Sequence, residues 1–119
     1  MPKRAHNPEF EPARLLDIFS DDRGAVREIL LEAATSIRDI VDRIPKDVAL
    51  KDKQAVASLL HTLTGMAANI GATRLSSLGG HLIKHIRQKQ SLPSDLVKRL
   101  RSAHDRFVAR IQEYLDSSS

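Results

Sequence analysis

Apolar side chains recur three and four residues apart along most of this chain, and polar or charged side chains fill the positions between them. This spacing follows the 3.6-residue turn of an α-helix and places the apolar positions on one face. No segment alternates between apolar and polar residues with the period of two that a half-buried strand shows. The pattern therefore predicts an all-α protein without a β-sheet.

The first two predicted helices are separated by a polar break at Ser20, Asp21 and Asp22. A short helix covers residues 11–19, and the three polar residues then supply an N-cap and first-turn acids for a second helix. We expect the second helix to end at Pro45, because proline lacks a backbone N–H and its ring clashes with the preceding turn.

Three further helices follow, and a local signal marks each boundary. Asp52 is suited to cap the third helix, which is expected to end near Gly71, a residue that readily adopts a left-handed C-terminal cap. A fourth helix is predicted over residues 72–89. A break that contains proline and serine separates it from a fifth helix, predicted over residues 93–116.

The apolar positions of the four longer helices define the expected core. They are Val26, Leu30, Ala33, Ile37, Ile40 and Ile44, then Val56, Leu59, Leu60, Leu63, Ala67 and Ile70, then Leu75, Leu78, Leu82 and Ile86, and finally Leu96, Leu100, Ala103, Phe107, Ile111 and Tyr114. Four such helices with short connections predict an antiparallel up-and-down four-helix bundle with a short additional N-terminal helix across one end. One bundle domain is expected over residues 11–116, between a flexible segment (1–10) and a tail (117–119).

His61 is the most informative residue of the chain, because its helical neighbours are all small. Ala57, Thr64, Gly65 and Ala68 lie one or two turns away on the same face. At about 100° per residue, His61 lies roughly 140° from the middle of the apolar stripe of its helix, so it is expected to face solvent. A single histidine is more often an ordinary surface residue, but a mid-helix glycine costs about 1 kcal/mol against alanine. Gly65 therefore favours close approach of a partner to this face.

Length and composition narrow the classes of protein. A chain of 119 residues suits one domain with one core. It contains no cysteine and no run of about 18 apolar residues, so we expect no disulfide and no membrane contact. The polar first residues lack the apolar stretch of a signal peptide, which favours a cytoplasmic protein. The initial methionine and the polar tail favour a free-standing protein.

The charge distribution adds a second feature to the same region. The net charge is +4, yet residues 53–94 contain no aspartate or glutamate, while lysine, arginine and histidine occur throughout. A surface of one sign attracts a partner of the opposite sign. Since this acid-free segment contains the third and fourth predicted helices, the exposed His61 and the positive surface are expected to coincide.

The residues from His61 to Leu75 resemble the signature of histidine-containing phosphotransfer (Hpt) domains. The family pattern is approximately His-x-Leu-Lys-Gly, then small residues, then Asn-x-Gly-Ala-x-x-Leu. This chain has His61-Thr62-Leu63-Thr64-Gly65, then Met66-Ala67-Ala68, then Asn69-Ile70-Gly71-Ala72, and Leu75. The likeness extends over about residues 11–116, including the Asp17-Ile18-Phe19-Ser20-Asp21-Asp22 stretch before the second helix.

The resemblance implies that His61 accepts a phosphoryl group from an aspartyl phosphate and passes it to another. The implied partners are response-regulator receiver domains, together with a hybrid sensor kinase, and the receiver would supply Mg²⁺. Ala57, Ser58, Thr64, Gly65 and Ala68 would form the docking face. The chain is then a phosphoryl carrier and not an ATP-dependent kinase, in keeping with the absence of a GxxxxGK[ST] loop. The pair at 79–80 is expected to allow close helix packing, not phosphate binding.

The main departure from the family pattern is Thr64. The family usually has lysine at this position, and that lysine is thought to help hold the phosphoryl group. We expect either the Thr64 hydroxyl or a cation from elsewhere, Lys84 first and Arg74 or Lys53 next, to take this role.

Other kinds of site are weaker alternatives. His81 and His85 have a four-residue spacing that suits metal binding, but no cysteine or nearby carboxylate completes a site, so we expect a structural pair and no metal. Ser58 lies one turn before His61, and no acid nearby in sequence would orient that histidine for hydrolysis.

The alternative function is a basic helical binding module for nucleic acid or an acidic protein, without phosphotransfer. Cations crowd the last helix at Lys98, Arg99, Arg101, Arg106 and Arg110. Aromatic residues make up only 3% of the chain, which is few for base stacking, so nucleic acid is the weaker partner class.

Overall fold

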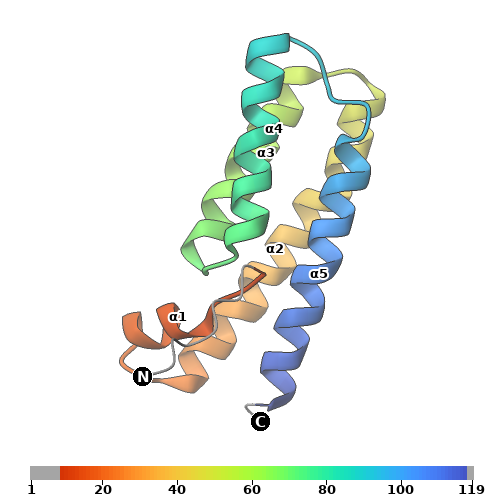
Figure 1. Ribbon diagram of the computed structural model, residues 1–119. Coiled ribbons are helices and arrows are strands. Elements are labelled where there is room, and N and C mark those ends of the chain that lie inside the picture. The colour runs from red at the N-terminus through yellow and green to blue at the C-terminus, as the bar shows by residue number, and fades with distance from the viewer. Residues whose placement is uncertain (1–8, 118–119) are drawn as a thin grey trace, which may run out of the picture.

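The computed structural model describes residues 9–117, which form five α-helices and no strand (Figure 1). The helices are α1 (Pro12–Ile18), α2 (Arg23–Ala49), α3 (Lys53–Asn69), α4 (Thr73–Lys89) and α5 (Leu96–Ser117). In Figure 1, α2 to α5 run alternately up and down, and the short α1 lies beside the start of α2. The all-α prediction and the antiparallel bundle are therefore confirmed.

The predicted N-caps are confirmed in α2 and α3. A side-chain oxygen of Asp22 accepts a hydrogen bond from the Ala25 backbone N–H at 3.0 Å, and Asp52 accepts one from Ala55 at 3.1 Å. Each bond satisfies a donor that the first helical turn would otherwise leave unpaired. Gly71 closes the turn between α3 and α4 with a φ of +80°, the left-handed conformation expected for it.

The prediction that the second helix ends at Pro45 is wrong. α2 continues through this residue to Ala49. The proline removes one hydrogen-bond donor from the helix, but the apolar stripe continues on both sides of it. Ile44 is fully buried and Val48 packs against the core, so tertiary contacts hold the last turn in place.

Two residues that we assigned to the flexible N-terminal segment contact the bundle. Residues 1–8 of that segment lie outside the described residues, as do residues 118 and 119 of the tail. Phe10 is fully buried, and its ring meets Tyr114 of α5 edge-on with 5.6 Å between ring centroids. The Glu9 carboxylate lies 2.9 Å from the guanidinium of Arg74 on α4. These two residues therefore attach the chain before α1 to the half of the bundle that is lower in Figure 1.

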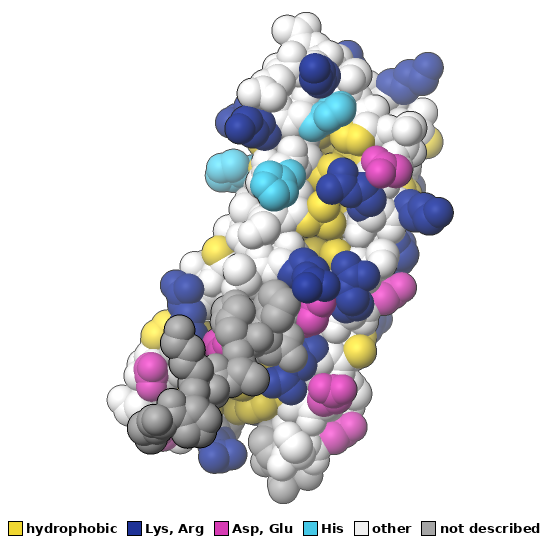
Figure 2. All heavy atoms as spheres, viewed as in Figure 1, with side chains coloured by type: hydrophobic (Ala, Val, Ile, Leu, Met, Phe, Trp, Pro, Cys, Tyr) yellow, Lys and Arg dark blue, Asp and Glu magenta, His cyan; other side chains and the backbone are white. Residues whose placement is uncertain are grey.

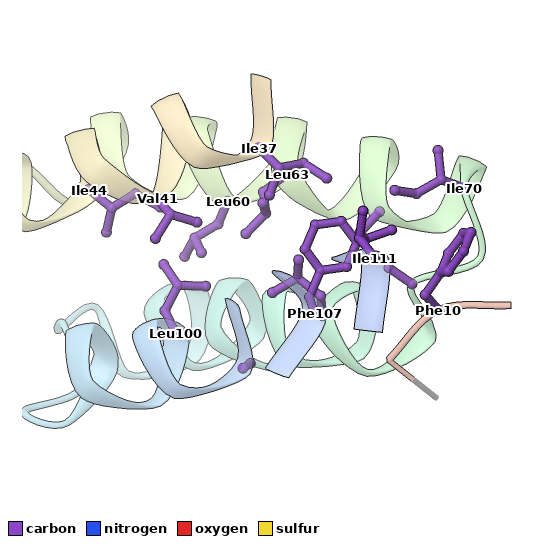
Figure 3. Packing of buried hydrophobic residues seen from close by; sticks show 14 of the residues in the cluster. Phe10, Ile37, Val41, Ile44, Leu60, Leu63, Ile70, Leu100, Phe107 and Ile111 are labelled. Carbon is purple, nitrogen blue, oxygen red and sulfur yellow. The ribbon is translucent and has the colours of Figure 1, made fainter. Parts of the chain in front are cut away.

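The core lies between α2, α3 and α5, and α4 closes it. Figure 3 shows Ile37, Val41 and Ile44 of α2 pointing toward Leu60 and Leu63 of α3, with side chains of α5 opposite them. The predicted inward residues are buried or pack against this core, including the complete stripe of α3. Burial of α3 along this stripe fixes which of its faces remains exposed.

The α3–α4 hairpin is packed closely at one glycine. A Cβ atom built on Gly79 would overlap the Thr64 hydroxyl and lie 3.6 Å from the Leu60 carbonyl oxygen. One turn away, the Ser76 hydroxyl donates a hydrogen bond to the Thr64 carbonyl at 3.2 Å. Close packing was expected at both glycines of the pair. It is present at Gly79, whereas a Cβ at Gly80 would meet nothing within 4 Å in the part of the chain that the structure describes.

The contact between Gly79 and Thr64 predicts opposite effects on stability when Gly79 and Gly80 are each replaced by alanine. Gly79→Ala is expected to lower the free energy of unfolding by about 1–2 kcal/mol, because the helices must separate or Thr64 must leave its rotamer. Gly80→Ala is expected to raise it by roughly 0.5–1 kcal/mol, since alanine favours the helix and the space is open. Urea unfolding measures both values.

The Thr64→Ala substitution tests the cause of the Gly79 effect. It removes the overlapping hydroxyl, so Gly79→Ala should become neutral or stabilising in a Thr64→Ala background. An equal loss of stability from Gly79→Ala in both backgrounds would contradict the proposed contact.

His104 is the only buried histidine within residues 9–117, and its Nε2 atom has no hydrogen-bond partner there. Burial lowers the pKa of His104 below its ordinary value of 6.5 by penalising the charged imidazolium, and repulsion from Arg101 and Arg38 adds to this effect. Asp105 and Asp42 act in the opposite direction. The folded chain therefore keeps this ring neutral at a pH where the unfolded chain protonates it.

We expect His104 to make the fold sensitive to acid. Below about pH 6.5 the unfolded state binds more protons at this residue than the folded state, so stability falls as the pH falls toward the lowered pKa. His104→Leu should reduce the difference in unfolding free energy between about pH 7.5 and about pH 5. His81→Gln, at an exposed position, should leave this difference unchanged. An unaltered pH dependence in the His104→Leu variant would contradict the assignment.

Candidate functional site

His61 lies on the exposed face of α3, opposite the residues that this helix buries. Its side chain is solvent-exposed, whereas Leu60 and Leu63 beside it in sequence are fully buried. The expectation that His61 faces solvent is therefore confirmed. A ring in this position can be reached by a group on another molecule.

The surface around His61 is built largely from small residues. Gly65 and Ala68 are exposed on the following turns, and Ser58 is exposed on the preceding turn. Ala57 is half-buried, and a Cβ added to Gly65 would meet no atom of the described residues within 4 Å. A partner can therefore come close to the backbone of α3 on the side that presents the imidazole.

Thr64 does not contribute its hydroxyl to this face. The Thr64 Oγ1 atom is buried against Gly79 at the α3–α4 contact, and it has no hydrogen-bond partner within the described residues. Our expectation that this hydroxyl contacts a docked phosphoryl group therefore disagrees with its position. The prediction for Thr64 failed because it used the helix wheel of α3 alone, which does not show how closely α4 packs against α3.

The three cations considered for phosphoryl binding lie in different places. Arg74 forms an ion pair with Glu9, and the Lys53 ammonium donates a hydrogen bond to the Gln90 carbonyl. Lys84 is exposed on α4. Both Arg74 and Lys53 are therefore engaged elsewhere, which leaves Lys84 as the candidate.

The register of the hairpin brings Lys84 to the level of His61. Thr64 of α3 contacts Gly79 of the antiparallel α4. His61 precedes Thr64 by three residues and Lys84 follows Gly79 by five, so both lie on the same side of this contact. At 1.5 Å per residue they are displaced by about 4.5 and 7.5 Å along the hairpin axis.

The Hpt domain family matches residues 14–116, which is nearly the whole chain. The chain belongs to the Hpt domain family. No curated protein and no solved structure matches it significantly. Membership supports a role as a histidine phosphotransfer carrier in a two-component system. Within residues 9–117, no helix combines the length and apolar content needed to cross a membrane.

The other histidines within the described part of this Hpt domain lie on α4 and α5. His81 is exposed and His85 is half-buried on α4. Figure 2 shows histidine side chains gathered over the upper part of the α3–α4 hairpin, with lysine and arginine nearby. No group of three or more histidine, aspartate or glutamate side chains within the described part of the chain could hold a metal ion.

A groove beside the small-residue face is a feature that the sequence did not reveal. It has a volume of about 340 Å³ and lies between α2 and α3. The residues lining it are Ile29, Glu32, Ala33, Ser36, Met66, Asn69 and Ile70. Met66 and Asn69 directly follow Gly65 and Ala68 in sequence, so the groove adjoins the face of the Hpt domain that carries His61. The polar or apolar character of the lining residues gives no sign of a hollow, because a hollow depends on the distance between α2 and α3.

Proposed function

We propose that this Hpt domain carries a phosphoryl group on His61 between aspartates of response-regulator receiver domains in a phosphorelay. The observation that carries the proposal is the exposed imidazole on a helix face where Gly65 and Ala68 leave the backbone open to a partner. Receivers act inside the cell, so we place the protein in the cytoplasm, with a hybrid sensor kinase as a further partner.

Phosphoryl transfer requires little of the carrier beyond a well-positioned and accessible imidazole. The unprotonated imidazole nitrogen of His61 attacks the phosphorus of an aspartyl phosphate while the bond from phosphorus to the carboxylate oxygen breaks. The aspartate leaves as a carboxylate, and the proton on the other ring nitrogen stays in place or is released to water. Transfer to a second receiver reverses these steps, with a new aspartate carboxylate as the nucleophile.

The partner supplies the charge that stabilises the reacting group. In this proposal the receiver contributes Mg²⁺ and the acidic residues that hold it, so the Hpt domain needs no metal of its own. Lys84 is the cation of the carrier that lies level with His61, and we propose that it attracts the phosphoryl oxygens. The groove between α2 and α3 would seat a convex part of the receiver beside Gly65 and Ala68.

A phosphotransfer assay tests the proposal. Receiver domains charged with acetyl phosphate are mixed with the wild-type protein, and the carrier is then tested for phosphate. Phosphohistidine is labile in acid and stable in alkali, whereas aspartyl phosphate is labile in alkali, so the two linkages are distinguished directly. Failure to label the carrier across a broad panel of charged receivers would overturn the proposed function.

A further inference from the structure

A second groove lies between α4 and the first half of α5. It has a volume of about 490 Å³, and the residues lining it are Arg74, Leu78, Asp95, Lys98, Arg99, Ser102, Ala103 and Arg106. We refer to it as the α4–α5 groove. In Figure 2, hydrophobic side chains form a strip between these helices, and lysine and arginine side chains flank it. The groove thus combines an apolar floor with four cations and one carboxylate.

The cations at the lower end of the groove already bind a carboxylate of the same chain. The Glu9 Oε1 atom lies 2.9 Å from Arg74 and 3.3 Å from Arg106, and the Glu9 side chain is only 15% exposed. Arg106 also donates a hydrogen bond to the Ser102 hydroxyl at 2.8 Å, which orients its guanidinium. The two arginines therefore form a preorganised carboxylate site.

The cations at the upper end are less engaged. Arg99 approaches Asp95 at 4.0 Å, with both side chains about half exposed. Lys98 is exposed, and no ion pair involves it within residues 9–117. Pairs of this kind are weak in water, so these cations remain open to a second molecule.

The chain itself shows what kind of ligand suits this surface. Glu9, Phe10 and Glu11 form a non-helical stretch before α1, and Glu11 has an extended backbone. In this stretch one carboxylate binds the arginine pair while the next side chain, Phe10, is buried. A carboxylate next to a buried apolar residue thus already lies against the arginine pair at the end of the groove.

We propose that the α4–α5 groove docks an acidic extended segment of a partner protein. Asp95 and Arg106 are eleven residues apart, which corresponds to about 16 Å along the helix. At about 3.3 Å per residue, an extended segment of roughly five residues spans this length. Its carboxylates pair with Lys98 and Arg99, and an apolar side chain covers Leu78 and Ala103. This surface is distinct from the His61 face, and the proposal does not rest on phosphotransfer.

An acidic peptide fits the α4–α5 groove better than a nucleic acid does. Among residues 9–117, no aromatic side chain lines the groove, so these residues offer bases nothing on which to stack. Asp95 lies among the cations and repels a continuous row of phosphates, whereas separated carboxylates can avoid it. The apolar floor also favours a ligand that carries apolar side chains.

An NMR titration tests this proposal. The probe is the blocked hexapeptide Glu-Ser-Leu-Glu-Ser-Glu, added to the isotope-labelled full chain at about 50 mM salt, where surface charges are weakly screened. We expect shift changes along α4 and α5 around Leu78, Lys98 and Ser102, and none centred on His61. Lys98→Glu with Arg99→Glu should weaken binding at least about tenfold.

Two further variants distinguish binding in the groove from a general effect of the net charge on peptide affinity. Arg23→Glu with Arg27→Glu makes the same charge change on exposed positions of α2, so it should leave peptide affinity within about twofold of wild type. The neutral pair Lys98→Gln with Arg99→Gln should give an intermediate loss, and circular dichroism checks that each variant folds. Equal affinity for the wild-type and Lys98→Glu/Arg99→Glu proteins would overturn the proposal.

Glu9 provides a test in the opposite direction. Glu9→Gln frees the arginine pair from its internal carboxylate, so peptide affinity should rise about threefold or more. Glu28→Gln removes an equal charge from an exposed position of α2 and should change affinity less. A duplex DNA oligonucleotide that binds the groove more tightly than the peptide at equal salt would also overturn the proposal.

Discussion

The His61→Gln variant is expected to fold as the wild-type chain does and to accept no phosphoryl group from a charged receiver. Glutamine has a similar length and polarity, and the side chain is exposed, so stability should change by no more than about 0.5 kcal/mol. The amide nitrogen of glutamine is not a nucleophile, because its lone pair is delocalised into the carbonyl. Label on the carrier should therefore fall to background in the assay described above.

Two histidines of α4 provide matched controls for this result. His81→Gln and His85→Gln carry the same substitution on the same hairpin and should label at the wild-type rate. Undiminished labelling of His61→Gln would mean that another histidine accepts the phosphoryl group. Loss of labelling in His81→Gln or His85→Gln alone would mean that the histidine accepting the phosphoryl group lies on α4.

The Gly65→Arg variant is expected to remain folded and to lose transfer. A Cβ atom added at this position would meet no atom of residues 9–117 within 4 Å, and arginine favours the helix more than glycine does. The free energy of unfolding should therefore rise by about 0.5–1 kcal/mol. The long side chain lies one turn from His61 and should hold the receiver away from the imidazole. We expect the rate of transfer to fall at least about 100-fold.

Two other glycine substitutions distinguish the effect of side-chain size on transfer from the effect of the added charge. Gly65→Ala adds only a methyl group, so it should retain most of the transfer rate. Gly24→Arg places the same cation near the start of α2, where its nearest neighbour is the Asp22 carboxylate, and should transfer normally. Initial rates with a phosphorylated receiver measure all three variants. Normal transfer by folded Gly65→Arg protein would contradict docking on this face.

Local patterns in the sequence were sufficient to predict most of the bundle. The apolar stripe of α3 predicted which side of the helix is buried, and hence that His61 is exposed. Asp22 and Asp52 act as N-caps because the capping bond joins residues three apart, and Gly71 adopts the left-handed turn that few other residues tolerate. Each of these features depends on neighbours within one or two helical turns.

Predictions failed where a residue meets a distant part of the chain. Pro45 should end a helix by its own chemistry, yet the buried Ile44 and the partly buried Val48 hold α2 together around it. The sequence predicts Thr64 on the docking face, but its hydroxyl is buried against Gly79. Both outcomes depend on packing between helices, which the periodicity of one helix does not contain.

The sequence by itself determined the helices, their caps, the family and the exposure of the proposed phosphoacceptor. Only the tertiary structure decided which surfaces lie side by side. It joined Glu9 to Arg74 and Arg106, left Lys84 level with His61, and opened grooves on both sides of the hairpin. The physical reason is that helix formation and capping are local interactions, whereas a groove or an ion pair between helices requires the distance and register that close packing sets.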